Sequence, residues 1–255
     1  MTAALTLAIG LVALLYASVG HAGATGYAAV MALAGLEPGV IRPTALALNV
    51  FVAAIGTFQF ARAGHFRRDL FLPLAAASVP CAAVGGAIRL APAAFEVLLG
   101  IVLLLSAGRI GIEAARESAE RPVAGDGPPA RPPQPVLLGL LGAGIGLLSG
   151  LTGVGGGVFL TPVLLAMQAA PVKQVAAVTA PFILVNSLAG LAGGMLAGGS
   201  PPPVSMPTLG AAVAGGTIGA HLGAVRLPVT ALRALMAAVL LVAAGKLLGG
   251  PLGWW

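Results

Sequence analysis

A long apolar segment of this sequence, residues 146–165, is interrupted by the triple glycine Gly155, Gly156 and Gly157 and by a Thr–Pro pair. A chain that only crossed a bilayer would not be broken at such a point, because an unpaired peptide group in hydrocarbon is costly. Irregular backbone at membrane depth survives only where protein or a water-filled cavity covers it. Breaks of this kind are the best indication in a sequence of a binding site inside the membrane.

The composition identifies the broad class of protein. The 255 residues are 58% hydrophobic and 8% charged, with a mean hydropathy of +1.03, which predicts an all-α polytopic membrane protein. The net charge of +6 does not indicate nucleic-acid binding, because the 13 basic residues are scattered at the ends of apolar segments without a basic patch. Cys81 is the single cysteine, which excludes an intramolecular disulfide and a cysteine metal cluster. No cofactor or metal is expected.

The hydrophobic pattern predicts five helices in the first half of the chain, and we expect the second half to repeat them, giving about eight to ten membrane segments. The expected first-half helices are residues 3–19, read as a retained helix rather than a signal peptide, then 25–36, 43–62, 70–89 and 93–112. Segment 25–36 would reach only about 18 Å, against a hydrocarbon core of about 30 Å. It is therefore expected to be a half-helix or one arm of a re-entrant hairpin, as are residues 158–168.

The two halves share short motifs in the same order, which predicts a duplication. The matches are residues 86–90 with 223–227, 102–109 with 239–246 and Asn49 with Asn186 at a spacing of 137, and residues 20–24 with 153–157 at a spacing of 133. Chance similarity in an Ala-, Leu- and Gly-rich sequence is the alternative. We predict membrane repeats at residues 1–112 and 136–255, joined by a solvated linker at 113–135, of which the first turn could continue the preceding helix.

The distribution of basic residues tests the orientation of the two halves. If each broken segment counts as two passes or as a re-entrant hairpin, the halves insert upside down relative to each other, and ten basic residues share one side against three on the other. If each broken segment is one continuous span, the split is eight against five. The positive-inside rule therefore favours two inverted-topology repeats, with a cytoplasmic linker and both termini outside. Trp254 and Trp255 would then anchor the outer interface.

Each half offers one half-helix whose N-terminus would lie near the middle of the membrane, starting near Thr25 and near Val158. Free N–H groups and the positive end of the helix dipole make such a terminus an anion site. Glycines at 155–157 would let the backbone approach a ligand without a Cβ in the way. The alternative explanation for these glycines is close packing between helices.

Polar side chains within apolar segments are the other candidates for the site. Asn49 and Asn186 are equivalent under the repeat and need partners in a medium that offers none, although an interhelical hydrogen bond would explain them equally well. Thr152 is a weaker candidate, because membrane threonines most often bond their own backbone. His21 lies in the first break, where it would exchange a proton near neutral pH or make a structural hydrogen bond. No carboxylate pair lies at midplane depth, which disfavours cation conduction and a di-metal site.

Two enzyme-like patterns are weak. Residues 153–157 echo nucleotide-binding glycines, but no strand precedes them and no acid follows at the ribose distance. Ser149 and His221 could be drawn as an intramembrane serine protease dyad, yet the serine lacks the spacing of a nucleophile turn. The chain is therefore not expected to be an enzyme.

Residues 149–165, and in reduced form residues 16–32, resemble the sulfite exporter TauE/SafE family of membrane permeases, and the resemblance covers nearly the whole chain. The first copy has His21, Ala22 and Ala24 where a triple glycine would stand, which predicts an asymmetric site with His21 acting on one side. The resemblance implies a carrier in the bacterial inner membrane for small sulfur-containing or organic anions such as sulfite or sulfonates.

We therefore hypothesise a secondary transporter, working as an exporter, that binds a small anion between the two half-helix starts and exposes it by rocking one repeat against the other. The candidate substrate-binding residues are Gly155, Gly156, Gly157, Thr152, Asn186, Asn49, His21 and Thr25. The expected partners are the anion and the lipid bilayer, with a homodimer left open and no nucleic acid. A membrane scaffold or accessory subunit that moves nothing is the alternative, and the serine protease is a more distant one.

Overall fold

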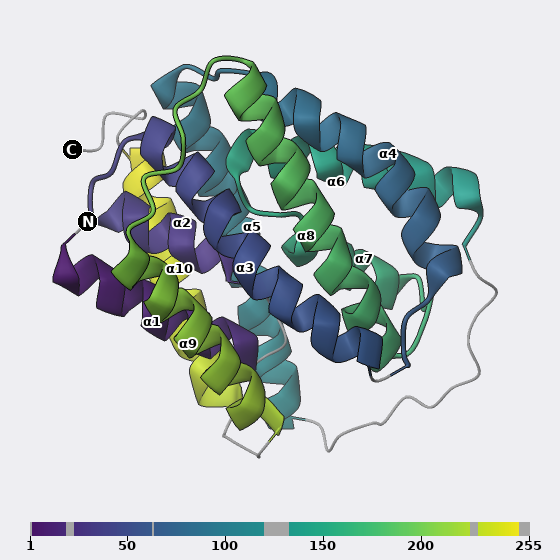
Figure 1. The fold of residues 1–255 in the computed structure, drawn as a ribbon. Coiled ribbons are helices and arrows are strands. Elements are labelled where there is room, and N and C mark those ends of the chain that lie inside the picture. The colour runs from purple at the N-terminus through teal and green to yellow at the C-terminus, as the bar shows by residue number, and fades with distance from the viewer. Residues whose placement is uncertain (1, 19–22, 63, 120–132, 225–228, 250–255) are drawn as a thin grey trace. The chain divides into compact units, whose positions relative to one another are not determined.

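The computed structural model describes residues 2–18, 23–62, 64–119, 133–224 and 229–249. Every regular element among these residues is an α-helix (Figure 1), which confirms the expected all-α class. The helices are α1 (Ala3–Ser18), α2 (Ala24–Leu33), α3 (Pro38–Arg62), α4 (Arg68–Ala87) and α5 (Pro92–Ala119) before residue 120, and α6 (Pro135–Thr152), α7 (Gly157–Ala166), α8 (Val172–Leu196), α9 (Met206–Ala224) and α10 (Val229–Gly249) after it.

Two helices are longer than the sequence indicated. α3 begins at Pro38 rather than at Pro43, because proline is favoured in the first turn of a helix, where its missing N–H is not needed. The carbonyl oxygen of Glu37 accepts the first hydrogen bonds of this helix, and Pro43 lies within it. α5 continues to Ala119 through charged residues of good helix propensity. The linker expected at 113–135 therefore begins as helix, over more than the single turn that we allowed.

The two short helices that we expected after the glycine breaks are confirmed. α2 and α7 have ten residues each, which corresponds to about 15 Å of helix, about half of a hydrocarbon core. Each follows a glycine in the left-handed conformation, Gly23 before α2 and Gly156 before α7. Among the described residues, α3, α4, α5, α6 and α8 contain apolar spans long enough to cross a membrane.

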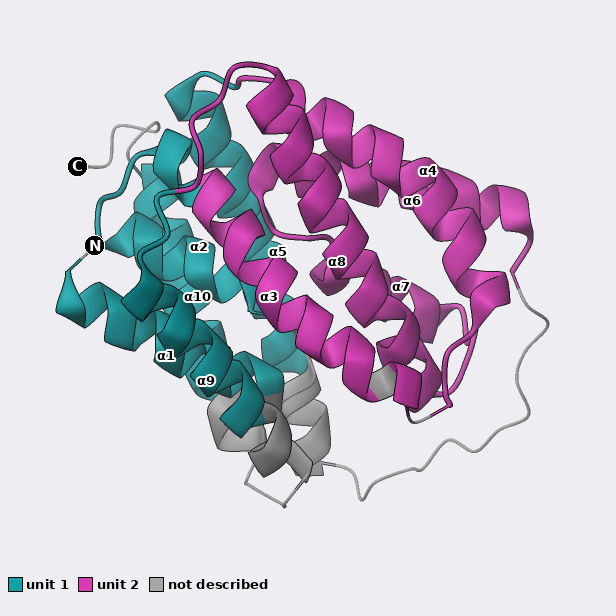
Figure 2. Cartoon of the chain, in the orientation of Figure 1, with its two compact units in different colours: residues 1–41, 90–124, 203–255 teal, residues 42–89, 125–202 magenta. Residues whose placement is uncertain are grey.

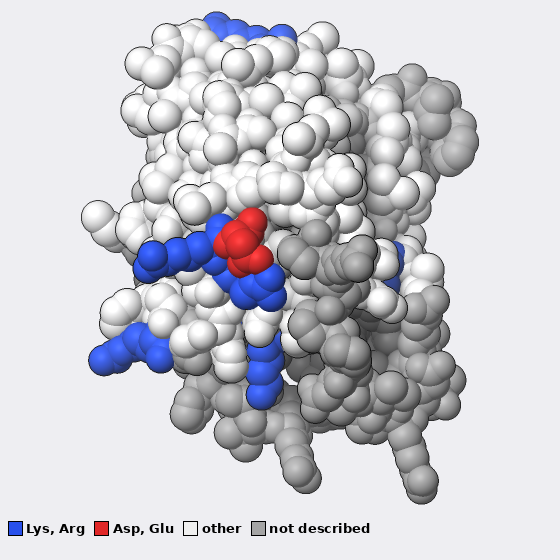
Figure 3. Space-filling view, turned by 90° about the vertical axis from the view of Figure 1, so that its right-hand side faces the viewer, with Lys and Arg blue, Asp and Glu red and all other residues white. Residues whose placement is uncertain are grey.

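The described surface suits a lipid environment. Large apolar side chains are exposed on many helices, and the extremes are Leu196 at 90% and Met206 at 82%. On the face shown in Figure 3, charged side chains occupy small areas and most of the described surface is uncharged. Such a surface would be an aggregation risk in water and is ordinary in hydrocarbon.

The chain forms two compact units, and each draws helices from both halves of the sequence (Figure 2). Unit 1 comprises residues 1–41, 90–124 and 203–255, and so holds α1, α2, α5, α9 and α10. Unit 2 comprises residues 42–89 and 125–202, and so holds nearly all of α3 together with α4, α6, α7 and α8. The first helix of each half therefore packs against the fourth helix of the other, α1 along α9 and α6 along α4.

In unit 2, α4 lies so close to α6 and α8 that only glycine fits between the backbones. A β-carbon added at Gly142, Gly146 or Gly150 of α6 would lie 2.1 to 2.3 Å from a carbonyl oxygen of α4. One added at Gly193 of α8 would lie 2.0 Å from the carbonyl oxygen of Ala83. Close packing, which we considered for the glycines at the break, is thus the role of these glycines within the helices. Beside this contact lies a buried apolar cluster that includes Leu70, Leu74, Leu138, Leu160, Leu164 and Phe182.

In unit 1, α9 approaches α1 in the same manner. Added β-carbons at Gly215 and Gly219 would each lie 2.2 Å from a carbonyl oxygen of α1. α5 packs along α10, and α2 contacts both α1 and α10. The Nζ atom of Lys246 on α10 donates to the carbonyl oxygens of Ala32 and Leu33, at 3.0 and 2.9 Å. These are the last carbonyl groups of α2, so Lys246 caps the negative end of that half-helix.

Candidate functional site

The break between α6 and α7 is built from glycines in left-handed backbone conformations. Gly153 ends α6 with a φ of 80°, and Gly155 and Gly156 lead into α7 with φ values of 75° and 81°. Residues with a β-carbon adopt this region only at a cost of about 1–2 kcal/mol, so the density of glycine follows from the path of the chain. The path of the backbone therefore explains why the apolar run is interrupted by glycines at residues 155–157.

Gly155 brings the backbone of the break against polar side chains from two other helices of unit 2. A β-carbon added at Gly155 would lie 2.6 Å from Nδ2 of Asn49 on α3 and 3.2 Å from Oγ of Ser187 on α8. One added at Gly157 would lie 2.4 Å from Cδ1 of Ile183. Glycine is therefore needed here for close approach as well as for its conformation.

The polar side chains that lie against this break, and Asn186 beside Ser187 on α8, are buried and largely without partners. Asn49, Asn186, Ser187 and Ser149 are all 0% exposed. Neither the amide nitrogen nor the amide oxygen of Asn49 has a hydrogen-bond partner, and the same holds for Oδ1 of Asn186 and for the two serine hydroxyls. A buried polar group without a partner costs about 1–3 kcal/mol. A cluster of such groups is therefore expected where a ligand supplies the missing bonds.

Asn49 and Asn186 differ, although the sequence treats them as equivalent. The Nδ2 atom of Asn186 donates to the carbonyl oxygen of Phe182, one turn earlier on α8, at 2.8 Å. Neither asparagine makes the interhelical hydrogen bond that was the alternative explanation, as judged on the described residues. Both belong to unit 2, and Asn49 is the one whose side chain lies against Gly155.

Thr152 lies beside the break, but its hydroxyl is already used. Its Oγ1 donates to the carbonyl oxygen of Leu148 in the same helix at 2.7 Å, as membrane threonines commonly do. Thr161 and Thr179 pair with each other at 3.3 Å. These hydroxyls are thus less available to a ligand than those of Ser149 and Ser187, which the sequence gave no reason to prefer.

The start of α7 adds backbone donors to the same cluster. Gly156 caps α7 without a side-chain hydrogen bond, and none of the turn or cap hydrogen bonds of the described residues uses the amide of Gly155, Gly156 or Gly157. The positive end of the helix dipole lies here. Within the described residues of unit 2 the one carboxylate is Asp69, which pairs with Arg67. The break therefore presents donors without a competing negative charge.

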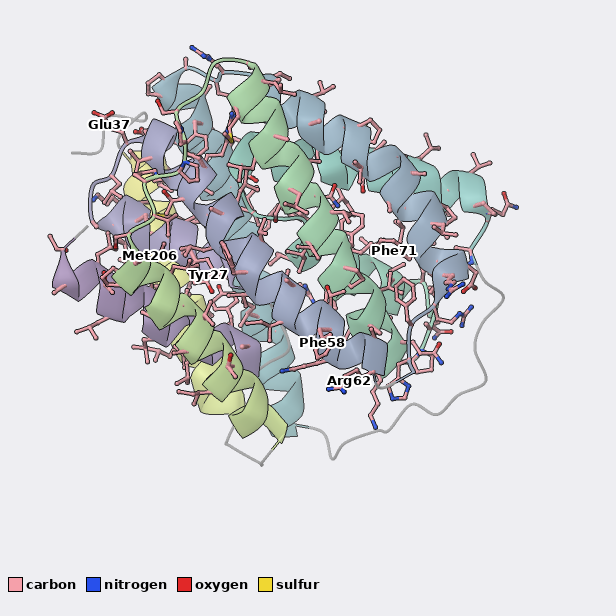
Figure 4. All side chains as sticks on the ribbon, in the orientation of Figure 1. Tyr27, Glu37, Phe58, Arg62, Phe71 and Met206 are labelled. Atoms are coloured by element: carbon pink, nitrogen blue, oxygen red, sulfur yellow. The ribbon has the colours of Figure 1, made fainter. Side chains whose placement is uncertain are left out.

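The first break lies partly outside the described residues, because His21 is not among them. Thr25 belongs to unit 1, is 0% exposed and donates from Oγ1 to the hydroxyl oxygen of Tyr16 at 3.0 Å. Tyr27 (Figure 4) is also fully buried, and its hydroxyl has no partner. Sequence reasoning missed both tyrosines, since a single phenol in an apolar helix is more often a core residue.

Two arginines cap the carboxyl ends of helices in unit 2, although we interpreted them from the sequence only as topology signals. Arg42 donates to the carbonyl oxygens of Ile88, at 2.8 Å, and of Gly86, both at the end of α4. Arg89 donates to the carbonyl oxygen of Ala197, which ends α8, at 2.6 Å. A cation satisfies the last carbonyl groups of a helix and its negative dipole end.

Taken together, unit 2 holds an uncharged cluster of amide and hydroxyl donors beside the N-terminus of a half-helix. Its chemistry suits a small anion, which would accept hydrogen bonds from Asn49, the serines and the glycine amides. No group of three or more His, Cys, Asp or Glu side chains that could hold a metal occurs among the described residues.

Comparison with known proteins gives the family. The model of the sulfite exporter TauE/SafE family matches residues 5–247. The "Probable membrane transporter protein y4hK" of Sinorhizobium fredii is 41% identical over 244 residues, which cover 96% of this chain and 97% of that protein. No solved structure shows a significant match. The family consists of transporters and not of enzymes, so the protease interpretation of Ser149 and His221 is set aside. The chain is a multi-pass membrane transporter that belongs to the TauE/SafE sulfite exporter family.

Proposed function

We propose that the chain is a secondary transporter that exports a small anion, either sulfite or a similar small sulfonate or organic anion. The family supports the substrate class, since its model is described as a sulfite exporter. The structure supports it independently, because the break between α6 and α7 gathers hydrogen-bond donors where no carboxylate is described. An anion would be stabilised there by charge-assisted hydrogen bonds, which are stronger than neutral ones.

The observation that carries the proposal is the set of unpartnered polar atoms at Asn49, Ser149 and Ser187 in unit 2. In an apolar interior each such atom lowers the stability of the protein without ligand. The amide of Asn49 offers two donor hydrogens and the serines one each. Together with the amides of residues 155–157 they would replace much of the hydration shell that a small anion loses on leaving water.

We also propose that the two halves are inverted repeats. Rocking of one whole half against the other is not part of the proposal, because each compact unit contains helices of both halves. The helices of the first half have 16, 10, 25, 20 and 28 residues and those of the second have 18, 10, 25, 19 and 21. The first four helices of each half thus share their order of lengths, and five passes per half would invert one half relative to the other. Together with the ten-to-three split of basic residues, this supports a cytoplasmic linker and outside termini in a bacterial inner membrane.

The test is transport by purified protein in liposomes loaded with sulfite. We expect saturable efflux that methanesulfonate or acetate competes with, and a thermal shift on addition of sulfite that is lost in Asn186→Ala. Protein-free liposomes measure the leak. A folded, monodisperse protein that moves none of these anions and is not stabilised by them would overturn the proposal and favour a membrane scaffold instead.

A further inference from the structure

The start of α2 in unit 1 holds a second group of hydrogen-bond donors, made of tyrosines instead of amides and serines. Gly23 precedes α2 in the left-handed conformation, with a φ of 86°. A β-carbon added to it would lie 2.9 Å from both Cζ and the hydroxyl oxygen of Tyr27. Side chains in a helix lean toward its N-terminus, which places the Tyr27 phenol over Gly23, the residue before its own helix.

The hydroxyl of Tyr27 has no hydrogen-bond partner, although the side chain is 0% exposed. A buried phenol normally finds a partner, and the absence of one costs free energy in the protein without ligand. The unpartnered oxygen lies at the N-terminus of a ten-residue helix, where the backbone itself offers donors.

Tyr16 of α1 approaches the same turn of α2. Its hydroxyl oxygen accepts the hydrogen bond from Thr25 at 3.0 Å, so its own proton is not used in that bond. A β-carbon added at Gly26 would lie 2.6 Å from Cε2 of Tyr16, which shows that the ring lies directly on the first turn.

The two ends of α2 have different neighbours. Lys246 satisfies the carboxyl end by donating to Ala32 and Leu33, so a positive charge balances the negative end of the dipole. At the amino end the described neighbours are the phenols of Tyr16 and Tyr27, which are donors without charge. A negative charge is the missing counterpart at this end.

We propose that the first turn of α2, with the hydroxyls of Tyr16 and Tyr27, binds an oxyanion. We call these two hydroxyls and the first turn of α2 the phenol subsite. It differs in chemistry from the amide and serine cluster of unit 2, so the transporter would bind its substrate through two different sets of donors. The inference rests on the proposed function for its substrate class, an oxyanion with at least two oxygen atoms such as sulfite or a sulfonate. One oxygen would accept from Tyr27 and another from Tyr16 or the amides of α2.

The test uses Tyr27→Phe, which removes one oxygen atom and leaves the ring. In reconstituted protein we expect the KM for sulfite to rise about tenfold or more, because a hydrogen bond to a charged group is lost. Without sulfite, the variant should melt at the same temperature as the parent or higher, since it loses an unpartnered buried hydroxyl. Thr6→Val in the same unit is the matched control, because the Thr6 hydroxyl already pairs with Thr208 at 3.0 Å. It should leave the KM unchanged.

A second measurement does not depend on transport. The chain has two tyrosines and both lie in this subsite, so protein labelled with 3-fluorotyrosine gives fluorine NMR signals from this place alone. We expect sulfite to shift both signals, and Tyr27→Phe to assign them. If Tyr27→Phe does not fold, Tyr16→Phe provides the same comparison.

The outcomes separate this inference from the proposed function. A parent protein that moves no sulfite contradicts the proposed function. A parent that moves sulfite while Tyr27→Phe and Tyr16→Phe keep its KM, with fluorine signals that do not respond, overturns the phenol subsite alone. A lower melting temperature in Tyr27→Phe without any change in KM would make the hydroxyl structural and would also overturn it.

Discussion

Replacing Asn49 by leucine separates a binding role from a structural one. Asn49 is 0% exposed and neither polar atom of its amide has a partner. Each unsatisfied buried group costs about 1–3 kcal/mol, and leucine has nearly the same size. Asn49→Leu should therefore raise the unfolding free energy of the ligand-free protein by at least about 1 kcal/mol. For a chain of this length that corresponds to a melting temperature higher by about 2–4 °C.

Transport should change in the opposite direction. The amide of Asn49 adjoins Gly155 at the start of α7, and a hydrogen bond from it to a bound anion would contribute about 1.5–3 kcal/mol. Its loss should raise the KM for sulfite about 10- to 150-fold, measured as efflux from liposomes beside a thermal melt of the same preparation. Ser106→Ala is the control, because the buried Ser106 hydroxyl donates to Val102 at 2.6 Å and lies on α5, outside unit 2. It should leave the KM as it is.

A particular combination of results would refute this reasoning. If Asn49→Leu lowers the melting temperature and leaves the KM for sulfite unchanged, the amide stabilises the fold and does not bind substrate. Asn186→Leu gives an internal comparison, since only Oδ1 of Asn186 lacks a partner. Its gain in melting temperature should be the smaller of the two.

Two glycine substitutions give further predictions. Gly155→Ala should abolish sulfite efflux and destabilise the protein by at least about 1–2 kcal/mol, because its β-carbon would lie 2.6 Å from Nδ2 of Asn49. Gly144→Ala on α6, where nothing lies within 4 Å, should instead stabilise by about 0.5–1 kcal/mol in a thermal melt, and the reasoning fails if the two variants behave alike. Gly150→Ala would place a β-carbon 2.1 Å from the carbonyl oxygen of Ala82 and would push α4 away from α6. Its yield of monodisperse protein should fall sharply, and a normal yield would contradict the packing argument.

Several features of the fold were predictable because they depend on local chemistry. The apolar composition and the periodic hydrophobic runs predicted an all-helical membrane chain, and the glycines predicted two half-helices. The ends of α3 and α5 were missed for local reasons too. The first turn of a helix tolerates proline, as at Pro38. Charged residues of good helix propensity extend α5 to Ala119.

The candidate site was predictable only in part. Asn49, Asn186 and residues 155–157 stood out as polar or flexible positions in apolar sequence, and all of them lie in unit 2. Ser187 and Tyr27 did not stand out, because a lone hydroxyl in a helix is ordinary until its partners are known. Thr152 illustrates the converse, since its hydroxyl bonds its own helix.

The sequence by itself determined the class of protein, the positions of the breaks and the family, because hydrophobicity, backbone conformation and motif are properties of consecutive residues. Only the tertiary structure decided which polar atoms lack partners and which donors gather at each half-helix start. Asn49, Gly155 and Ser187 come from α3, the break and α8, and packing alone brings them together. Whether a buried polar group is satisfied depends on those distant neighbours, so the difference between Asn49 and Asn186 cannot be obtained from the sequence.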